Sequence, residues 1–248
     1  MHIIENKWKD KKMAELTTKE FNEIYKKYFK EYFDKPLKED GFKKKGTINF
    51  YRMNKLGLLE CLNFQRHYDS MTVNYLISPI HSPTFKTSMV LGERIGYLRY
   101  GNDYWWELKN EEEIKKSMKS ILEVIRNEVY TWFRKFENKY EYINLTNNPR
   151  VYEDIYEYLL KVTTAAKFGE YDKILPNVRK VKKEYENFPQ EEKEREGFKN
   201  ILKEALLLEE KLKEGKESVD EYIIEREKQS LIELGLDKMF NKKQKVKK

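Results

Sequence analysis

TINFYRMNKLGLLECLNFQRHYDSMTVNYLIS, residues 47–78, decides the fold class, because its apolar residues recur at every second position. The residues that share one face at the end of this stretch are Met71, Val73, Tyr75 and Ile77. This period is typical of half-buried β-strands. We therefore predict strands over 47–53, 58–66 and 71–78, and the short turns between them favour antiparallel pairing.

The stretch GERIGYLRYGNDYWWEL (92–108) continues the alternation. It predicts a fourth strand over 93–100 and a fifth over 103–108, with Gly101–Asn102 as the hairpin turn. Alternation also separates the two adjacent tryptophans. We expect Trp106 on the buried face of the last strand and Trp105 on its polar face.

Two amphipathic helices flank the predicted strands. Residues 17–38 have helical spacing, and Thr17 with Glu20 forms the pattern of a capping box, while Pro36 and Gly41 are expected to end this helix. Residues 110–140 carry a nearly unbroken apolar helical face after an Asn110 cap. Helix, antiparallel sheet and long helix together predict an α+β domain over 1–145.

No strand pattern follows residue 145. We expect a region of helical hairpins over 146–240 and a disordered lysine-rich tail over 241–248. The expected helices cover about 149–168, 170–187, 190–214 and 218–235. The last of these is expected to begin with a capping box made by Ser218 and Glu221.

Composition limits the cellular setting. The chain has 248 residues, a net charge of +7 and one cysteine, Cys61, so no disulfide framework is possible. The N-terminal residues have no apolar segment of signal-peptide length, and no apolar run is long enough to span a bilayer. These features predict a cytoplasmic protein without a membrane partner. Basic and acidic residues are interleaved along most of the chain, as on solvated helices.

Four segments in this order resemble a known bacterial family. They are PLKEDGFKKKG (36–46), INFYR (48–52), LECLNFQRH (59–67) and ERIGYLRYGNDYWWEL (93–108). Over roughly residues 18–140, the chain resembles the domain-of-unknown-function family numbered 4304. The resemblance implies the α+β fold and a bacterial, cytosolic origin. It implies no catalytic residue.

Catalytic and metal sites have little support in the sequence. The three histidines and Cys61 show no metal-ligand spacing, and neither a nucleophile elbow nor a glycine-rich phosphate loop is present, so we predict no metal and no cofactor. The remaining catalytic candidate is the polar strand end at Arg66, His67 and Asp69. Asp69 could orient His67 as a general base. Neighbours on a strand point to opposite faces, so a solvated turn is the competing interpretation.

Binding is the function that the sequence favours. The candidate binding residues belong to the types enriched at interface hot spots, and they are Arg52, Arg94, Tyr97, Arg99 and Trp105. We expect a non-enzymatic protein that binds a protein partner, in the manner of products of immunity or defence gene clusters. The first alternative is binding of single-stranded nucleic acid by a basic, aromatic sheet face. The second is an enzyme whose site is centred on His67.

Overall fold

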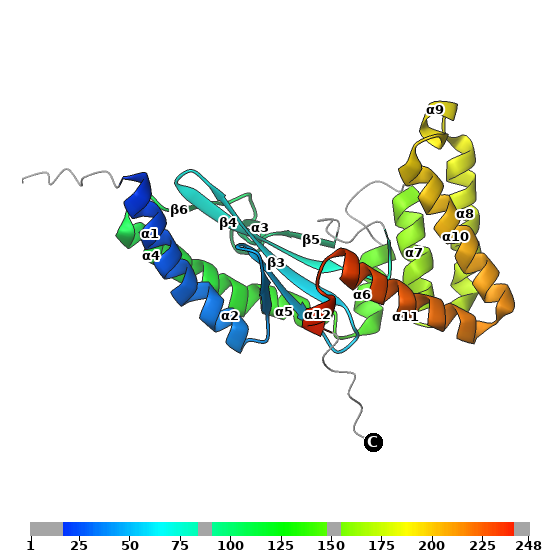
Figure 1. Cartoon of the computed structure of the whole chain (residues 1–248), viewed down its shortest axis with the longest axis horizontal. Coiled ribbons are helices and arrows are strands. Elements are labelled where there is room, and N and C mark those ends of the chain that lie inside the picture. The colour runs from blue at the N-terminus through cyan, green and yellow to red at the C-terminus, as the bar shows by residue number, and fades with distance from the viewer. Residues whose placement is uncertain (1–16, 84–90, 148–154, 241–248) are drawn as a thin grey trace, which may run out of the picture.

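A computed structural model describes residues 17–83, 91–147 and 155–240 of the chain. These residues form an antiparallel sheet, a layer of helices against one of its faces, and a group of helices beyond one end of the sheet (Figure 1). The fold is therefore α+β, as the sequence predicts. Within these ranges, no helix combines the length and the apolar character needed to cross a bilayer.

The sheet has the strand order β1-β2-β3-β4-β5, and β6 pairs with β4 on the same side as β5. The strands are β1 (Lys43–Lys45), β2 (Asn49–Met53), β3 (Leu59–His67), β4 (Ser70–Ser78), β5 (Gly92–Arg94) and β6 (Trp106–Glu107). All pairs are antiparallel. The three strands predicted over 47–78 are thus confirmed. β1 was not predicted, because a run of three lysines has no apolar alternation.

The predictions for strands over 93–100 and 103–108 are wrong in most of their length. Only Gly92–Arg94 and Trp106–Glu107 pair with β4, and the residues Ile95–Tyr100 form the helix α3. Ile95 and Leu98 lie three residues apart, and both pack into the core of the domain. A helical turn places them on one side, whereas a strand would point them to opposite faces. Gly101 ends α3 in the left-handed conformation (φ 71°), so it caps a helix instead of closing a hairpin.

Helices from both ends of the domain cover one face of the sheet (Figure 1). They are α1 (Thr18–Phe29), the π-turn Lys30–Asp34, α2 (Lys35–Glu39), α4 (Glu111–Val124), the π-turn Ile125–Val129 and α5 (Tyr130–Lys135). The capping box at Thr17 and the Asn110 cap are confirmed. Pro36, however, does not end the first helix, which continues to Glu39. The π-turn before it, in which Lys35 N–H bonds to the Lys30 carbonyl, gives the chain the local widening that an internal proline requires.

The sheet and these helices enclose the main core. Met71, Val73, Tyr75 and Ile77 are all buried on the helix-covered face, as their alternation predicts. Phe29, Phe33 and Phe64 meet edge-on or tilted in the middle of this core, with centroids 4.5–5.1 Å apart. Such aromatic packing supplies the buried area that the modest apolar content of the chain would otherwise lack.

A helical region follows the long helix, which ends at Lys135, short of the predicted residue 140. The next helices are α6 (Lys139–Asn147), α7 (Ile155–Lys167), α8 (Ile174–Asn187, preceded by the turn Tyr171–Lys173), α9 (Gln190–Lys193), α10 (Glu196–Glu214), α11 (Lys216–Glu233) and α12 (Asp237–Phe240). α7, α8, α10 and α11 share a second core. The predicted capping box at Ser218 is wrong, because α11 begins at Lys216 and the Ser218 hydroxyl donates to Glu214 instead. The predicted tail over 241–248 lies outside the described residues.

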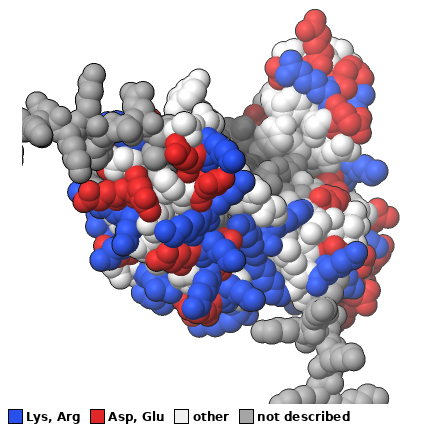
Figure 2. Space-filling view, turned by 60° about the vertical axis from the view of Figure 1, so that its left-hand side comes forward, with Lys and Arg blue, Asp and Glu red and all other residues white. Residues whose placement is uncertain are grey.

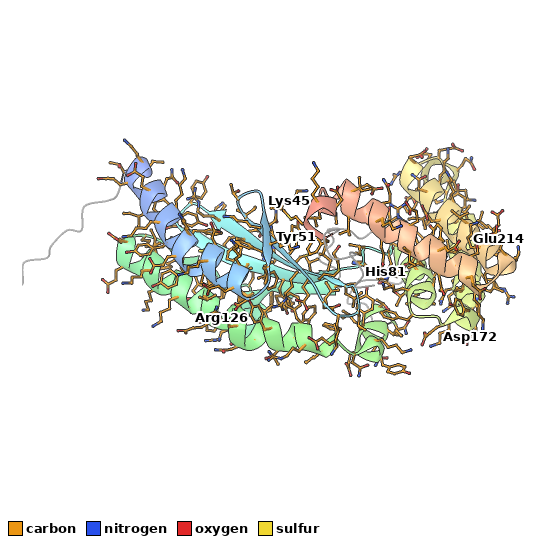
Figure 3. All side chains as sticks on the ribbon, turned by 60° about the horizontal axis from the view of Figure 1, so that its bottom comes forward. Lys45, Tyr51, His81, Arg126, Asp172 and Glu214 are labelled. Atoms are coloured by element: carbon orange, nitrogen blue, oxygen red, sulfur yellow. The ribbon has the colours of Figure 1, made fainter. Side chains whose placement is uncertain are left out.

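The C-terminal helices return to the sheet. α11 runs from the helical region toward the strands, and its end packs with α12 against the second face of the sheet (Figure 1). Leu231 and Leu236 meet Leu59, Cys61 and Leu76 there. The Cys61 thiol is buried, and burial raises its pKa, so it is an inert core group. Figure 3 shows Lys45 and Tyr51 beside this C-terminal end, where the Lys45 ammonium donates to the Leu234 carbonyl.

Candidate functional site

The corner formed by α3 and the loop to β6 is held tightly. A Cβ atom on Gly96 would lie 2.5 Å from the Tyr104 backbone nitrogen, so only glycine allows α3 to approach this loop so closely. On the other side, Arg99 Nε donates to Glu128 Oε1 at 2.5 Å and ties α3 to the π-turn of the long helix. The backbone of the corner is therefore fixed from two directions.

Three tyrosines are exposed on this corner, and we call Tyr97, Tyr100 and Tyr104 the tyrosine patch. The centroids of the Tyr100 and Tyr104 rings lie 4.4 Å apart. Both rings contact Trp106, with centroid distances of 5.9 Å for Tyr100 and 4.9 Å for Tyr104. Trp106 itself is buried and donates from Nε1 to Ser120 of α4 at 3.1 Å. The exposed rings thus rest on an aromatic residue that is anchored in the core.

The burial of Trp106 and the position of Trp105 follow the predicted alternation. Trp106 pairs with Met71 on the helix-covered face, and the half-buried Trp105 precedes it. The Arg94 guanidinium lies over the Trp105 ring, 5.3 Å from its centroid, and also bonds to Asp103. The Arg94 guanidinium is therefore stacked on the Trp105 ring, and Asp103 neutralises its charge.

Arg94 stands at the end of a polar row that crosses the second face of the sheet. Asn63 donates to Asn49 at 2.7 Å and Asn74 donates to Asn63 at 3.0 Å, and Arg94 is the cross-strand neighbour of Asn74. Such a ladder satisfies amide groups across strands. The Nε of Arg94 and the Oδ1 of Asn74 are both buried and lack a hydrogen bond to any described residue. Because the two residues are direct partners on adjacent strands and the row is bonded amide to amide, we assign the row a structural role.

Arg52 does not belong to this corner. It lies on the helix-covered face of β2, whereas Arg94 lies on the opposite face of the sheet. Its Nε donates to the buried Glu60 at 2.6 Å and its Nη1 donates to the Asp40 carbonyl at 2.9 Å. The predicted binding residues therefore divide into a group of four around α3 and the separate Arg52.

The candidate catalytic residues sit at the tip of the β3–β4 hairpin and do not converge. His67 and Asp69 are exposed, and among the described residues no hydrogen bond joins their side chains. The His67 ring instead lies against Tyr68, with centroids 4.4 Å apart. Arg66 points to the other face, where it covers the rings of Phe21 and Tyr25 and bonds to Asn22 at 3.1 Å. The arrangement is a solvated turn.

Family comparison places the corner and Arg52 within one matched segment. Residues 33–135 match the family model Domain of unknown function (DUF4304). We call this matched segment the DUF4304 domain. It includes the whole sheet, α3 and the long helix, whereas the helical region after α5 lies outside the match. No curated protein and no solved structure is significantly similar to the chain.

Charge around the DUF4304 domain is mixed in sign. Figure 2 shows Lys and Arg interspersed with Asp and Glu over this end of the molecule. Each arginine near the tyrosine patch has an acidic partner, Asp103 for Arg94 and Glu128 for Arg99. In the described part of the chain, no three His, Cys, Asp or Glu side chains are placed to hold a metal ion.

Sequence reasoning identified Tyr97 but missed Tyr100 and Tyr104. Tyr104 was expected on the buried face of a strand, because alternation places it with Trp106. The signal that could have shown its exposure is the pair Gly96 and Gly101. Gly96 allows α3 to approach the Tyr104 backbone closely, and Gly101 ends α3 in the left-handed conformation.

Proposed function

We propose that the chain is a non-enzymatic protein that binds a protein partner through the tyrosine patch of its DUF4304 domain. The observation that carries the proposal is the stack of Tyr100 and Tyr104 on the buried Trp106. Rings that are already ordered lose little conformational entropy on binding, which is why tyrosine and tryptophan dominate interface hot spots.

The chemistry of the patch specifies the kind of partner. Its rings offer apolar faces and three phenolic hydroxyl groups, while its arginines are neutralised by Asp103 and Glu128. A charge-balanced aromatic surface suits a protein surface with apolar side chains and backbone or side-chain hydrogen-bond groups at its centre. We expect side-chain contacts rather than strand addition, because both edges of the sheet end in strands of two or three residues and one edge is a run of lysines.

Binding of single-stranded nucleic acid has less support. The patch has stacking rings, but a nucleic-acid site also needs cations free to contact phosphates. Arg94 and Arg99 beside the patch each have a carboxylate partner, and Arg52 lies on the other face of the sheet, so the predicted basic sheet face is divided. A gel shift with single-stranded DNA and RNA at low salt tests this alternative. A shift that weakens steeply as salt rises would favour it.

The setting that we propose is a bacterial cytosol, within an immunity or defence gene cluster. The family resemblance and the single cysteine support the first part, and analogy with other small bacterial binding proteins supports the second. A gene for a toxin or nuclease beside this gene would strengthen that assignment.

Affinity purification from native lysate tests the proposal. The double variant Tyr100→Ser/Tyr104→Ser removes two exposed rings (45% and 39% exposed) that contribute little to the core. The matched control is Tyr68→Ser/Tyr140→Ser, which removes two exposed rings (83% and 61%) elsewhere on the chain. We expect one protein to be enriched with the wild type and the control and lost with the patch variant. No enriched protein, or equal enrichment by all three, contradicts the proposal.

A further inference from the structure

A cleft of about 440 Å³ opens where α11 crosses the end of the sheet. One wall comes from the DUF4304 domain and the other from α11 and α12, so the site exists only because the C-terminal helices return to the domain. Its size falls within the range of small-molecule sites. The tyrosine patch contributes no residue to its lining.

The cleft has an apolar part and a cationic part. The apolar lining residues are Met53, Ile80, Ile224, Leu231 and Phe240. The charged lining residues are Lys43, Arg52, Lys228 and Glu227. The lining therefore holds three cations and one carboxylate. Of the cations, Lys43 donates to the Met239 carbonyl and Lys228 pairs with Glu225 at 3.3 Å. Lys167, which is not part of the lining, pairs with Glu227 at 2.6 Å and compensates the charge of that carboxylate.

Arg52 is the fixed group of the cationic part. The buried Glu60 and the Asp40 carbonyl hold two of its nitrogens, and its guanidinium lies over the rings of Phe42 and Tyr130, 4.4 and 4.9 Å from their centroids. Its Nη2 makes no hydrogen bond to any described residue and is available as a donor. A guanidinium locked in this way binds an anion without losing further side-chain entropy.

From this combination we propose that the cleft binds a small amphipathic anion, an apolar body that carries one carboxylate or phosphate group. Arg52, with Lys228 at the rim, receives the anionic group, and the apolar lining residues receive the body. The proposal requires both parts, since Glu60 already pairs with Arg52 and a bare anion gains little there. It is independent of the tyrosine patch and of any protein partner.

Fluorescence titration of the full chain with anilinonaphthalene sulfonate, followed by competition, tests the binding chemistry. We expect saturable binding of one probe molecule. Octanoate should displace the probe, whereas octanamide lacks the charge and acetate lacks the body, so each should compete at least about tenfold more weakly. Equal competition by octanoate and octanamide, or no displacement by octanoate, overturns the proposal.

Two variants on one helix locate the site. Ile224→Asp places a carboxylate in the cleft, and Ile232→Asp places the same charge on α11 outside it; the two side chains are 51% and 54% exposed. We expect Ile224→Asp to weaken octanoate competition by about tenfold or more and Ile232→Asp to leave it within about twofold. Equal effects of the two variants place the probe elsewhere and overturn the assignment.

A third variant tests the role of Arg52. Replacing Arg52 alone would leave Glu60 buried without its partner, so the double variant Arg52→Met/Glu60→Gln removes both charges together. Circular dichroism checks that the chain remains folded. We expect this variant to lose the preference for octanoate over octanamide. If the preference persists, Arg52 does not receive the anion and the proposal fails.

Discussion

His81 makes stability depend on pH in a way that can be measured. It lies in the loop after β4, between the sheet and the helical region (Figure 3), and it is fully buried. Its Nε2 lies 3.3 Å from Thr164 Oγ1, and its ring contacts Tyr142 edge-on with centroids 5.9 Å apart. Burial, and then the positive charge of Lys167, lower the pKa of His81 from 6.5 to about 3.

The magnitude follows from linkage between proton binding and folding. Below pH 6.5 the unfolded chain binds a proton at His81, whereas the folded chain binds it only near pH 3. The free energy of unfolding therefore falls as pH decreases through this window, by about 1.4 kcal/mol per pH unit. Between pH 7 and pH 4 the loss from this one group is about 3 kcal/mol. Burial raises the pKa of Glu60 and of Glu227. These two groups therefore raise the free energy of unfolding as pH decreases, opposite to His81.

Urea unfolding at pH 7 and at pH 4, followed by circular dichroism, isolates the contribution of His81. His81→Gln removes the titrating group but keeps a polar side chain near Thr164, and Glu60 and Glu227 are unchanged in both proteins. The variant should lose about 3 kcal/mol less than the wild type between the two pH values. His67→Gln is the control, because His67 is exposed on the β3–β4 turn. Equal losses in wild type and His81→Gln would show that His81 has the same pKa in the folded and unfolded chains, and would refute the reasoning.

Three further changes test how the corner is built. Trp106→Ala removes a buried ring and should cost about 3–5 kcal/mol of unfolding free energy, measured by urea unfolding. Trp105→Ala, at a half-buried site, should cost clearly less. Equal costs would contradict the strand register. Gly96→Ala forces a Cβ against the Tyr104 backbone and should cost about 1–3 kcal/mol of unfolding free energy. It should also change the near-ultraviolet circular dichroism of the patch, and an unchanged spectrum would refute the close approach. Asn110→Ala removes the cap of α4 and should cost about 1 kcal/mol, measured in the same way, and a neutral result would contradict the capping bond to Glu113.

The predicted fold was most accurate where one periodicity ran for many residues. Strands β2, β3 and β4 and the helices that begin at Thr18 and Glu111 follow patterns that no other structure satisfies as well. The strand prediction over Ile95–Tyr100 was wrong: apolar groups at positions one and four share the side of a helical turn, but six residues are too few for such spacing to decide alone. The contact with the Tyr104 backbone, which only glycine at position 96 allows, selects the helix. That contact is tertiary and cannot be read from local spacing.

The site was only partly predictable for the same reason. Residue types indicated Arg94, Tyr97, Arg99 and Trp105, and the structure gathers them around α3. Nothing local distinguished Arg52 from these residues, because its separation depends on which face of β2 the helices cover. The cleft at Arg52 was also beyond prediction, since its second wall comes from α11, more than 160 residues later in the chain.

Site-specific photocrosslinking tests the central claim, that the tyrosine patch of the DUF4304 domain is an interface for a protein partner. Benzoylphenylalanine is introduced in living cells as Tyr100→benzoylphenylalanine, and as Tyr140→benzoylphenylalanine on α6 for comparison, since both side chains are exposed. We predict a discrete protein adduct from position 100 that is lost when Tyr104→Ser is added, and no such adduct from position 140. The same adduct from both positions, or none from position 100, would contradict the claim.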